Sequence, residues 1–157
     1  MLASSHPIAS SIGIEILKSG GNAVDAAIAM NAVLCIAEPH MTGVGGDCFV
    51  MLSVDGSTNI KALNGSGKSS SNAKASALRK NKLSVITPEM PDAITIPGAI
   101  AAWSLLHKEH GYMSWKDLIG PAINYATQGI KVHEGRVGLA KKYSKIIIGF
   151  RYIKAFS

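Results

Sequence analysis

Several residue classes are scarce in this chain. Charged residues make up 17% and aromatic residues 6% of its 157 residues, and only two cysteines, Cys35 and Cys48, are present. The two cysteines make no disulfide framework and lack metal-ligand spacing, so we expect buried or half-buried free thiols and no metal site. The low share of charge, combined with 47% hydrophobic residues, excludes an intrinsically disordered chain.

A long apolar run and a targeting signal are also missing. The longest nearly apolar run covers residues 26–37 and contains Asn31, so it is too short to cross a bilayer. The N-terminal residues MLASSHP show neither the basic region nor the apolar region of a signal peptide. We therefore expect a cytoplasmic protein without a membrane partner.

The net charge of +6 falls on one part of the chain. Residues 101–157 carry nine basic and three acidic groups, whereas residues 1–100 carry seven of each. A basic segment is one feature of nucleic-acid-binding proteins, but no RNA- or DNA-binding motif accompanies it here. A solvated basic helix over about residues 134–145 explains the charge more simply, so no nucleic-acid partner is expected.

Apolar periodicity and capping signals predict most of the helices. Helices are expected over residues 6–19, 23–37 and 97–110, and a short polar helix over 72–81. Asn22 and Asp25 form a capping-box pattern at the start of the second helix. That helix is apolar nearly all round, which predicts a buried helix.

A further helix is expected after Ser114, and its middle contains a proline. Ser114 and Asp117 have the spacing of a helix cap, and the segment runs to about Thr127. Pro121 lies within it, which predicts a break or a new first turn. Residues 83–96 are expected to be extended or irregular, because Pro88 and Pro91 oppose a helix.

One hairpin is predicted between the helical regions. Residues 48–54 and 59–63 have the composition of strands, and Asp55-Gly56 is a tight-turn signal between them. A single hairpin is not a stable sheet by itself. We therefore expect an α+β fold of two helices, a hairpin and further helices that is incomplete on its own, with its missing strands in another chain or in sequence not present here.

Few residues suggest chemistry by themselves. The glycine loop over residues 42–46 follows a helix and precedes a strand, the reverse of a phosphate-binding loop, so we expect close backbone packing or close approach to a substrate, and no nucleotide cofactor. His107 and His110 are interpreted as a surface pair, and Asp47 as a cap of its own loop. Lys68 lies on a glycine-rich turn after the second strand, where it is either a carboxylate-binding cation or a solvated lysine.

Several motifs together resemble a known family. They are ASSHPIAS at 3–10, GGNAVDAA at 20–27, EPHMTGVGGD at 38–47, IPGAIAAW at 96–103 and WKDLIGPA at 115–122. These blocks resemble the start of the large chain of gamma-glutamyltransferases, and the resemblance covers about residues 3–135. It implies an N-terminal nucleophile hydrolase with a four-layer αββα sandwich, of which this chain would hold the N-terminal part.

The resemblance also implies a reaction and a partner. Such proteins are made as one precursor and cut themselves into a large and a small chain. The N-terminal threonine of the small chain attacks a γ-glutamyl amide, commonly that of glutathione, and water or an amino acid releases the acyl group. The implied partners are therefore the small chain of the same precursor and a γ-glutamyl or related amide substrate. No cofactor is implied.

The resemblance places no catalytic residue in this chain, because the family's threonine nucleophile and oxyanion glycines lie in the second half. It does imply one substrate-binding residue. The family has an arginine after the second strand that binds the α-carboxylate of the glutamyl group, and the matching residue here is Lys68. A lysine keeps the charge but loses the bidentate fork, and the surrounding Asn-Gly-Ser-Gly is similar to a gamma-glutamyltransferase-like branch for which other amides are open as substrates.

These observations leave two interpretations of the whole chain. In the first, residues 1–145 are the N-terminal large-chain portion of a gamma-glutamyltransferase-like enzyme, and residues 146–157 are a divergent or truncated tail. Such a portion is expected to be inactive by itself. In the second, the chain is a non-catalytic or degenerate remnant that acts only as a folded interaction module.

Overall fold

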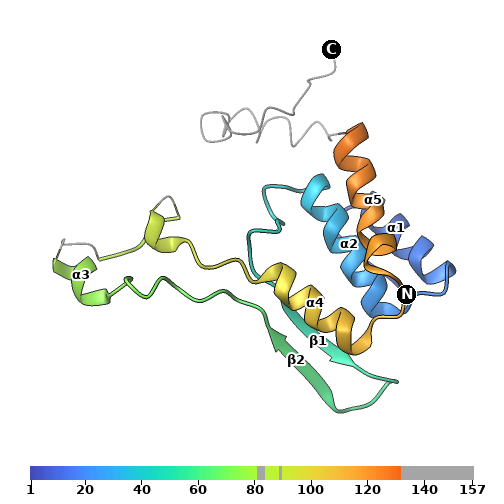
Figure 1. Ribbon diagram of the computed structural model, residues 1–157, viewed down its shortest axis with the longest axis horizontal. Helices are drawn as coiled ribbons and strands as arrows, with labels where there is room; N and C mark the ends of the chain where they lie inside the picture. Colours follow the sequence, from blue (N-terminus) through green and yellow to red (C-terminus); the bar gives the residue numbers. More distant parts are fainter. Residues whose placement is uncertain (81–83, 89, 132–157) are drawn as a thin grey trace.

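A central helix, α2 (Ala23–Ala37), organises the fold. The computed structural model describes residues 1–80, 84–88 and 90–131. Three helices pack against α2 (Figure 1), namely α1 (Pro7–Lys18), α4 (Ala99–His110) and α5 (Trp115–Gln128). Nine residues of α2 are buried, which confirms the buried helix expected from its apolar sequence.

Local capping explains where the first two helices begin. Pro7 opens α1, and the ring nitrogen Nδ1 of His6 accepts the N–H of Ile8 at 3.2 Å. At α2 the side chain of Asn22 accepts the N–H of Asp25 at 3.0 Å, and the Asp25 carboxylate accepts the N–H of Asn22, also at 3.0 Å. The predicted capping box is therefore confirmed, and it satisfies N–H groups that the helix itself leaves unpaired.

The predicted hairpin forms from β1 (Phe49–Ser53) and β2 (Ile60–Asn64). The strands are antiparallel, with Phe49 opposite Asn64 and Ser53 opposite Ile60. Asp55 and Gly56 adopt positive φ angles of 54° and 69°. They are the central residues of a tight turn that the hydrogen bond from the Ser57 N–H to the Val54 carbonyl oxygen closes at 2.9 Å, within the longer connection over residues 54–59.

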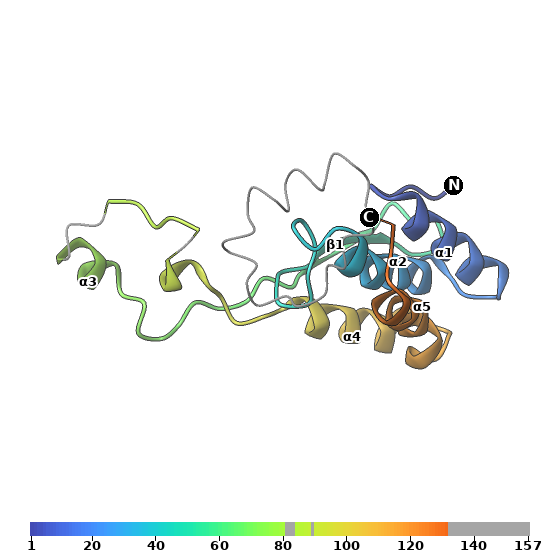
Figure 2. The same cartoon turned by 90° about the horizontal axis from the view of Figure 1, so that it is seen from above.

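A long excursion separates β2 from α4. The described residues between 66 and 98 leave the body of the molecule and return to it, and both views show α3 projecting far from α1, α2, α4 and α5 (Figures 1 and 2). The excursion contains α3 (Ala75–Lys80) and a short 3-10 helix (Pro91–Ala93). The short helix predicted over 72–81 is therefore confirmed, while the segment predicted as extended is interrupted by a 3-10 turn.

The prediction of a break at Pro121 is wrong, because α5 is continuous through that residue. Gly120 precedes the proline and has no Cβ, which removes the clash that normally drives the preceding residue out of the helical region. Leu118 and Ala122 lie on either side and are both buried. Packing on both sides of the proline thus holds the helix together.

The core is built mainly by helices. Buried apolar side chains come from α1, α2, α4 and α5, including Ala9, Ile12, Val33, Trp103 and Leu118. The hairpin adds only partly buried residues such as Cys48 and Leu52, and Phe49 and Met51 of β1 are 68% and 79% exposed. The described residues therefore form a mixed α/β unit with one two-stranded sheet.

Two sequence predictions concern residues that the structure does not describe. The basic helix expected over 134–145 and the tail over 146–157 lie outside the described residues. Among the helices that are described, none combines the length and the apolar character needed to cross a membrane.

Candidate functional site

Three segments that are distant in sequence meet at the N-terminal end of α4. The carbonyl oxygen of Gly46 accepts the N–H groups of Gly98 and Ala99 at 3.1 and 3.0 Å. Cys48 and Gly65 exchange two backbone hydrogen bonds, at 2.7 and 3.4 Å, which extend the β1–β2 ladder by one pair. The glycine loop before β1, the turn after β2 and the start of α4 are therefore joined by backbone hydrogen bonds.

Glycines allow the turn after β2 and the segment before α4 to pass very close to each other, and we call this place the crossing. A Cβ at Gly67 would lie 1.5 Å from the carbonyl oxygen of Ile96, and a Cβ at Gly98 would lie 2.1 Å from that of Gly65. Close backbone packing was one expectation for the loop over residues 42–46, but Gly43 and Gly45 have nothing within 4 Å of such an atom. Close backbone packing therefore occurs, but not at Gly43 or Gly45. It occurs where the turn after β2 meets the segment before α4, at Gly67 and Gly98.

Lys68 lies at this crossing. Its carbonyl oxygen accepts the N–H of Ile96 at 3.0 Å, so the segment that leads back to α4 holds its backbone. Its side chain is exposed, and no acidic residue of the described parts of the chain forms an ion pair with it. The ammonium group therefore points into solvent from a fixed backbone, which is the arrangement required of either a ligand-binding cation or a solvated lysine.

Asp47 differs from its expected role. The sequence predicts a cap of its own loop, but the Oδ1 of Asp47 accepts the N–H of Gly67, at 3.3 Å. The carboxylate thus reaches across to the turn that carries Lys68. Sequence reasoning missed this contact, because 20 residues separate the two partners and no local pattern links them.

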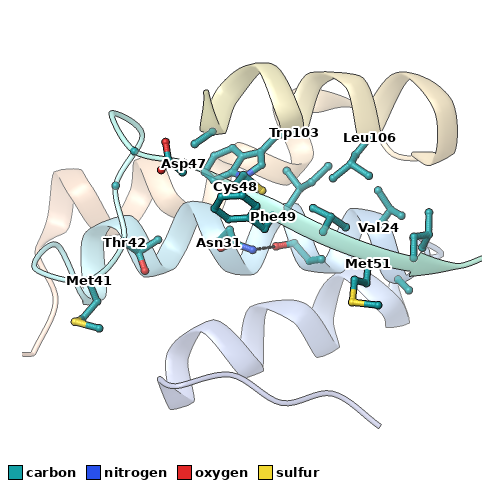
Figure 3. Close-up of a pocket in the computed structure, with 18 residues that line it drawn as sticks. Val24, Asn31, Met41, Thr42, Asp47, Cys48, Phe49, Met51, Trp103 and Leu106 are labelled. Carbon is teal, nitrogen blue, oxygen red and sulfur yellow. Dashed lines mark hydrogen bonds between the residues drawn. The ribbon is translucent and has the colours of Figure 1, made fainter. Parts of the chain in front are cut away.

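A cleft of about 560 Å³ lies beside the crossing, between α2, β1 and α4 (Figure 3). Trp103 and Leu106 of α4 line one side, and small residues of α2 line another. Ala23, Ala27 and Asn31 lie four residues apart along α2, and Asn31 donates to the carbonyl oxygen of Ala27 at 3.0 Å. Although most of α2 is buried, as its apolar sequence predicts, one strip of its smaller side chains is open to the cleft.

The polar rim of the cleft is contributed by the loop before β1. Thr42 and Asp47 lie on this rim, and Cys48 follows them at the start of the strand (Figure 3). The rest of the lining is largely apolar and includes Phe49 and Met51 of β1. Asp47 is the residue that belongs both to the cleft and to the Lys68 turn.

Both thiols are poor nucleophiles in this structure. Cys35 and Cys48 are free and half-buried, as predicted. Burial raises the pKa of both, and a hydrogen bond from the Trp103 side chain only partly offsets the rise at Cys48. Since the thiolate is the reactive form, neither cysteine is equipped for covalent catalysis at neutral pH.

The two histidines near the end of α4, His107 and His110, have structural partners. His107 was expected on the surface, but it is half-buried: its Nε2 lies 2.7 Å from the carbonyl oxygen of Met113, and its ring contacts Trp115 edge to face. His110 lies 3.7 Å from the carboxylate of Glu109. Within residues 1–80, 84–88 and 90–131, no three His, Cys, Asp or Glu side chains form a group that could hold a metal ion.

Comparison with known proteins places these features in a family. The family model for gamma-glutamyltranspeptidase matches residues 9–150. The chain is 36% identical to the Glutathione hydrolase-like YwrD proenzyme of Bacillus subtilis over 152 residues, which is 97% of this chain and 29% of that protein. The chain thus matches less than a third of the length of such curated relatives, 29% of this one and 23% of the Glutathione hydrolase proenzyme of Bacillus subtilis.

Solved structures agree. Helicobacter pylori gamma-glutamyltranspeptidase superposes with a TM-score of 0.83 at 27% identity, covering 95% of this chain and 43% of that one. A cephalosporin acylase from Bacillus halodurans superposes with a TM-score of 0.82 at 33% identity, covering 93% of this chain and 27% of that one. On the family match, these superpositions and the motifs above, this chain belongs to the gamma-glutamyltranspeptidase family of N-terminal nucleophile hydrolases.

Proposed function

We propose that this chain is the N-terminal part of the large chain of an enzyme that hydrolyses or transfers γ-glutamyl groups, with Lys68 as the residue that binds the α-carboxylate of the donor. One observation carries the assignment of Lys68. Its backbone is held at the crossing beside the cleft by the hydrogen bond from Ile96, while its exposed ammonium has no ion-pair partner in the described parts of the chain. A cation on a rigid turn at the outlet of a strand is suited to an anionic ligand.

In this proposal the reacting groups come from a small chain of the same precursor. An N-terminal threonine there attacks the γ-carbonyl carbon of the donor, the amide bond breaks, and the amine leaves with a proton. Water or an amino acid then attacks the acyl-enzyme and releases the glutamyl group. The present chain contributes Lys68, which holds the α-carboxylate of the donor so that its γ-carbonyl meets the nucleophile.

The small chain also accounts for the incomplete sheet. Phe49 and Met51 expose apolar side chains on β1, and a hairpin needs further strands or a covering layer to be stable. We assign that cover to the small chain, which completes the layered sandwich. We also propose that the protein is located in the cytoplasm.

The donor need not be glutathione. The YwrD relative is described as glutathione hydrolase-like and the Bacillus halodurans structure as a cephalosporin acylase, so related chains are named for different amides. Lysine in place of a bidentate arginine holds a carboxylate with less geometric control. We therefore propose a γ-glutamyl or related carboxylate-bearing amide as the substrate class.

The test of Lys68 uses the enzyme assembled from this chain and its small chain. Lys68→Ala removes a charge-assisted hydrogen bond, so we expect kcat/KM for a γ-glutamyl anilide to fall about ten- to a hundredfold. Lys68→Arg should retain most of the activity, and Lys61→Ala, which removes an exposed lysine from β2, is the matched control. Equal values for the wild type and Lys68→Ala would contradict the assignment.

A second measurement separates this enzyme from the remnant interpretation. Purified residues 1–157 should not release anilide by themselves, because no threonine of the chain lies in the context of the family's nucleophile. Addition of the small chain should then produce activity. Turnover by the isolated chain would refute the proposal that the small chain supplies the nucleophile. A small chain that binds without producing activity would favour the interpretation of this chain as a non-catalytic remnant.

A further inference from the structure

Asp47 occupies a position that nothing in the family resemblance assigns. Backbone hydrogen bonds hold the residues on both sides of it. Gly46 accepts the N–H groups at the start of α4, and Cys48 pairs with Gly65 in the ladder. The carboxylate of Asp47 therefore projects from a backbone that is anchored to two other elements, α4 and the end of β2.

The contact made by this carboxylate is one residue away from Lys68. Asp47 Oδ1 accepts the N–H of Gly67 at 3.3 Å, and the carbonyl oxygen of Lys68 accepts the N–H of Ile96 at 3.0 Å. The two hydrogen bonds hold the turn from opposite sides, just before and just after the lysine. Of the two, only the first is made by a side chain, so a side-chain substitution can remove it without altering the backbone.

The glycine at the contact explains why an external acceptor is required. A Cβ at Gly67 would collide with the carbonyl oxygen of Ile96, so the turn is limited to glycine there. Glycine has the largest conformational freedom of any residue, and a turn built on it needs outside contacts to keep one geometry. Asp47 supplies such a contact on the side of the cleft.

We propose that Asp47 is a positioning residue for Lys68: through the Gly67 N–H it holds the Lys68 turn in the geometry that presents the ammonium to the carboxylate of the donor. This inference rests on the proposed function of Lys68. Asp47 acts through the turn and not on the substrate, so its effect appears in donor binding and depends on the presence of Lys68.

The hydrogen bond itself can be tested on the 157-residue chain. We expect the Gly67 amide to exchange with solvent only about three- to tenfold faster in Asp47→Ala than in the wild type, measured by NMR, because the bond is slightly longer than the usual range. Asp47→Asn keeps an acceptor oxygen and should restore most of the protection. Asp55→Asn, a change in the exposed hairpin turn, should have no effect on Gly67. Unchanged exchange in Asp47→Ala would overturn the proposal.

The consequence for binding is tested in the assembled enzyme with a double-mutant cycle. Asp47→Ala should raise KM for a γ-glutamyl anilide about three- to tenfold with kcat nearly unchanged, and Asp47→Asn should recover most of that loss. In a Lys68→Ala background, Asp47→Ala should change KM by less than about twofold. An equal effect of Asp47→Ala in both backgrounds would overturn the proposal. A wild-type KM in Lys68→Ala alone would instead overturn the function proposed for Lys68, so the two failures are distinguishable.

Discussion

The carboxylate of Asp25 accepts the backbone N–H of Tyr112, 87 residues further along the chain, at 3.2 and 3.1 Å from its two oxygens. The same carboxylate accepts the N–H of Met113 at 3.4 Å and closes the capping box with Asn22. Asn22 in turn donates from its side chain to the carbonyl oxygen of His110. The N-terminal cap of α2 is therefore also the attachment point of the turn between α4 and α5.

Asp25→Ala should strongly destabilise the chain. The side chain is fully buried, and its loss leaves several backbone N–H groups without an acceptor. We expect the free energy of unfolding to fall by about 2–4 kcal/mol. Urea unfolding followed by circular dichroism measures the change, with Asp92→Ala, a change at an exposed residue of the excursion, as the control. Equal midpoints for Asp25→Ala and the control would show that the carboxylate is dispensable.

Gly67→Ala should be far more costly than Gly45→Ala. The first substitution places a Cβ 1.5 Å from the Ile96 carbonyl oxygen, whereas the second meets nothing within 4 Å. The crossing must open to accept the methyl group, so we expect a loss of about 1–3 kcal/mol for Gly67→Ala and a change within about 0.5 kcal/mol for Gly45→Ala. Thermal unfolding of the two variants under the same conditions makes the comparison. A similar melting temperature for both would mean that the two backbones separate freely.

The exposed face of the hairpin should bind a hydrophobic dye when the chain is alone. Phe49 and Met51 are 68% and 79% exposed and lie two residues apart on β1, on one side of the strand. The double substitution Phe49→Ser, Met51→Ser should lower the fluorescence of bound 1-anilinonaphthalene-8-sulfonate at least about twofold. Val85→Ser, which removes another exposed aliphatic residue, should change it little. Equal fluorescence from all three proteins would place the dye elsewhere.

Alkylation of Cys48 should be slow in the folded chain and should accelerate as the pH rises. Burial raises its pKa, so the folded state favours the neutral thiol. The resulting stabilisation is fully present below the ordinary pKa of a thiol and is lost as the pH rises through the raised value. In a Cys35→Ala background, iodoacetamide at pH 8 should react more slowly with the folded chain than with the denatured chain. Equal rates would contradict the raised pKa.

Patterns within a few residues were enough to predict most of the elements. The capping box at Asn22, the Asp55-Gly56 turn and the Ser114 cap are each made by residues at most three apart, and each lies where the sequence predicts it. The burial of α2 follows from its lack of a polar face. The family motifs, read without any structure, led to the same family that the comparisons show.

The sequence by itself thus determined the identity of the helices, the hairpin turn and the family. Only the tertiary structure decided that α5 continues through Pro121, that Asp47 holds the Lys68 turn, and that the close glycines are Gly67 and Gly98. Caps and turns depend on hydrogen bonds between near neighbours in the chain, which a local pattern can express. The contact of Asp47 with Gly67 joins residues 20 apart, and that of Asp25 with Tyr112 joins residues 87 apart. Such contacts exist only once packing has brought separate segments together, so no local pattern contains them.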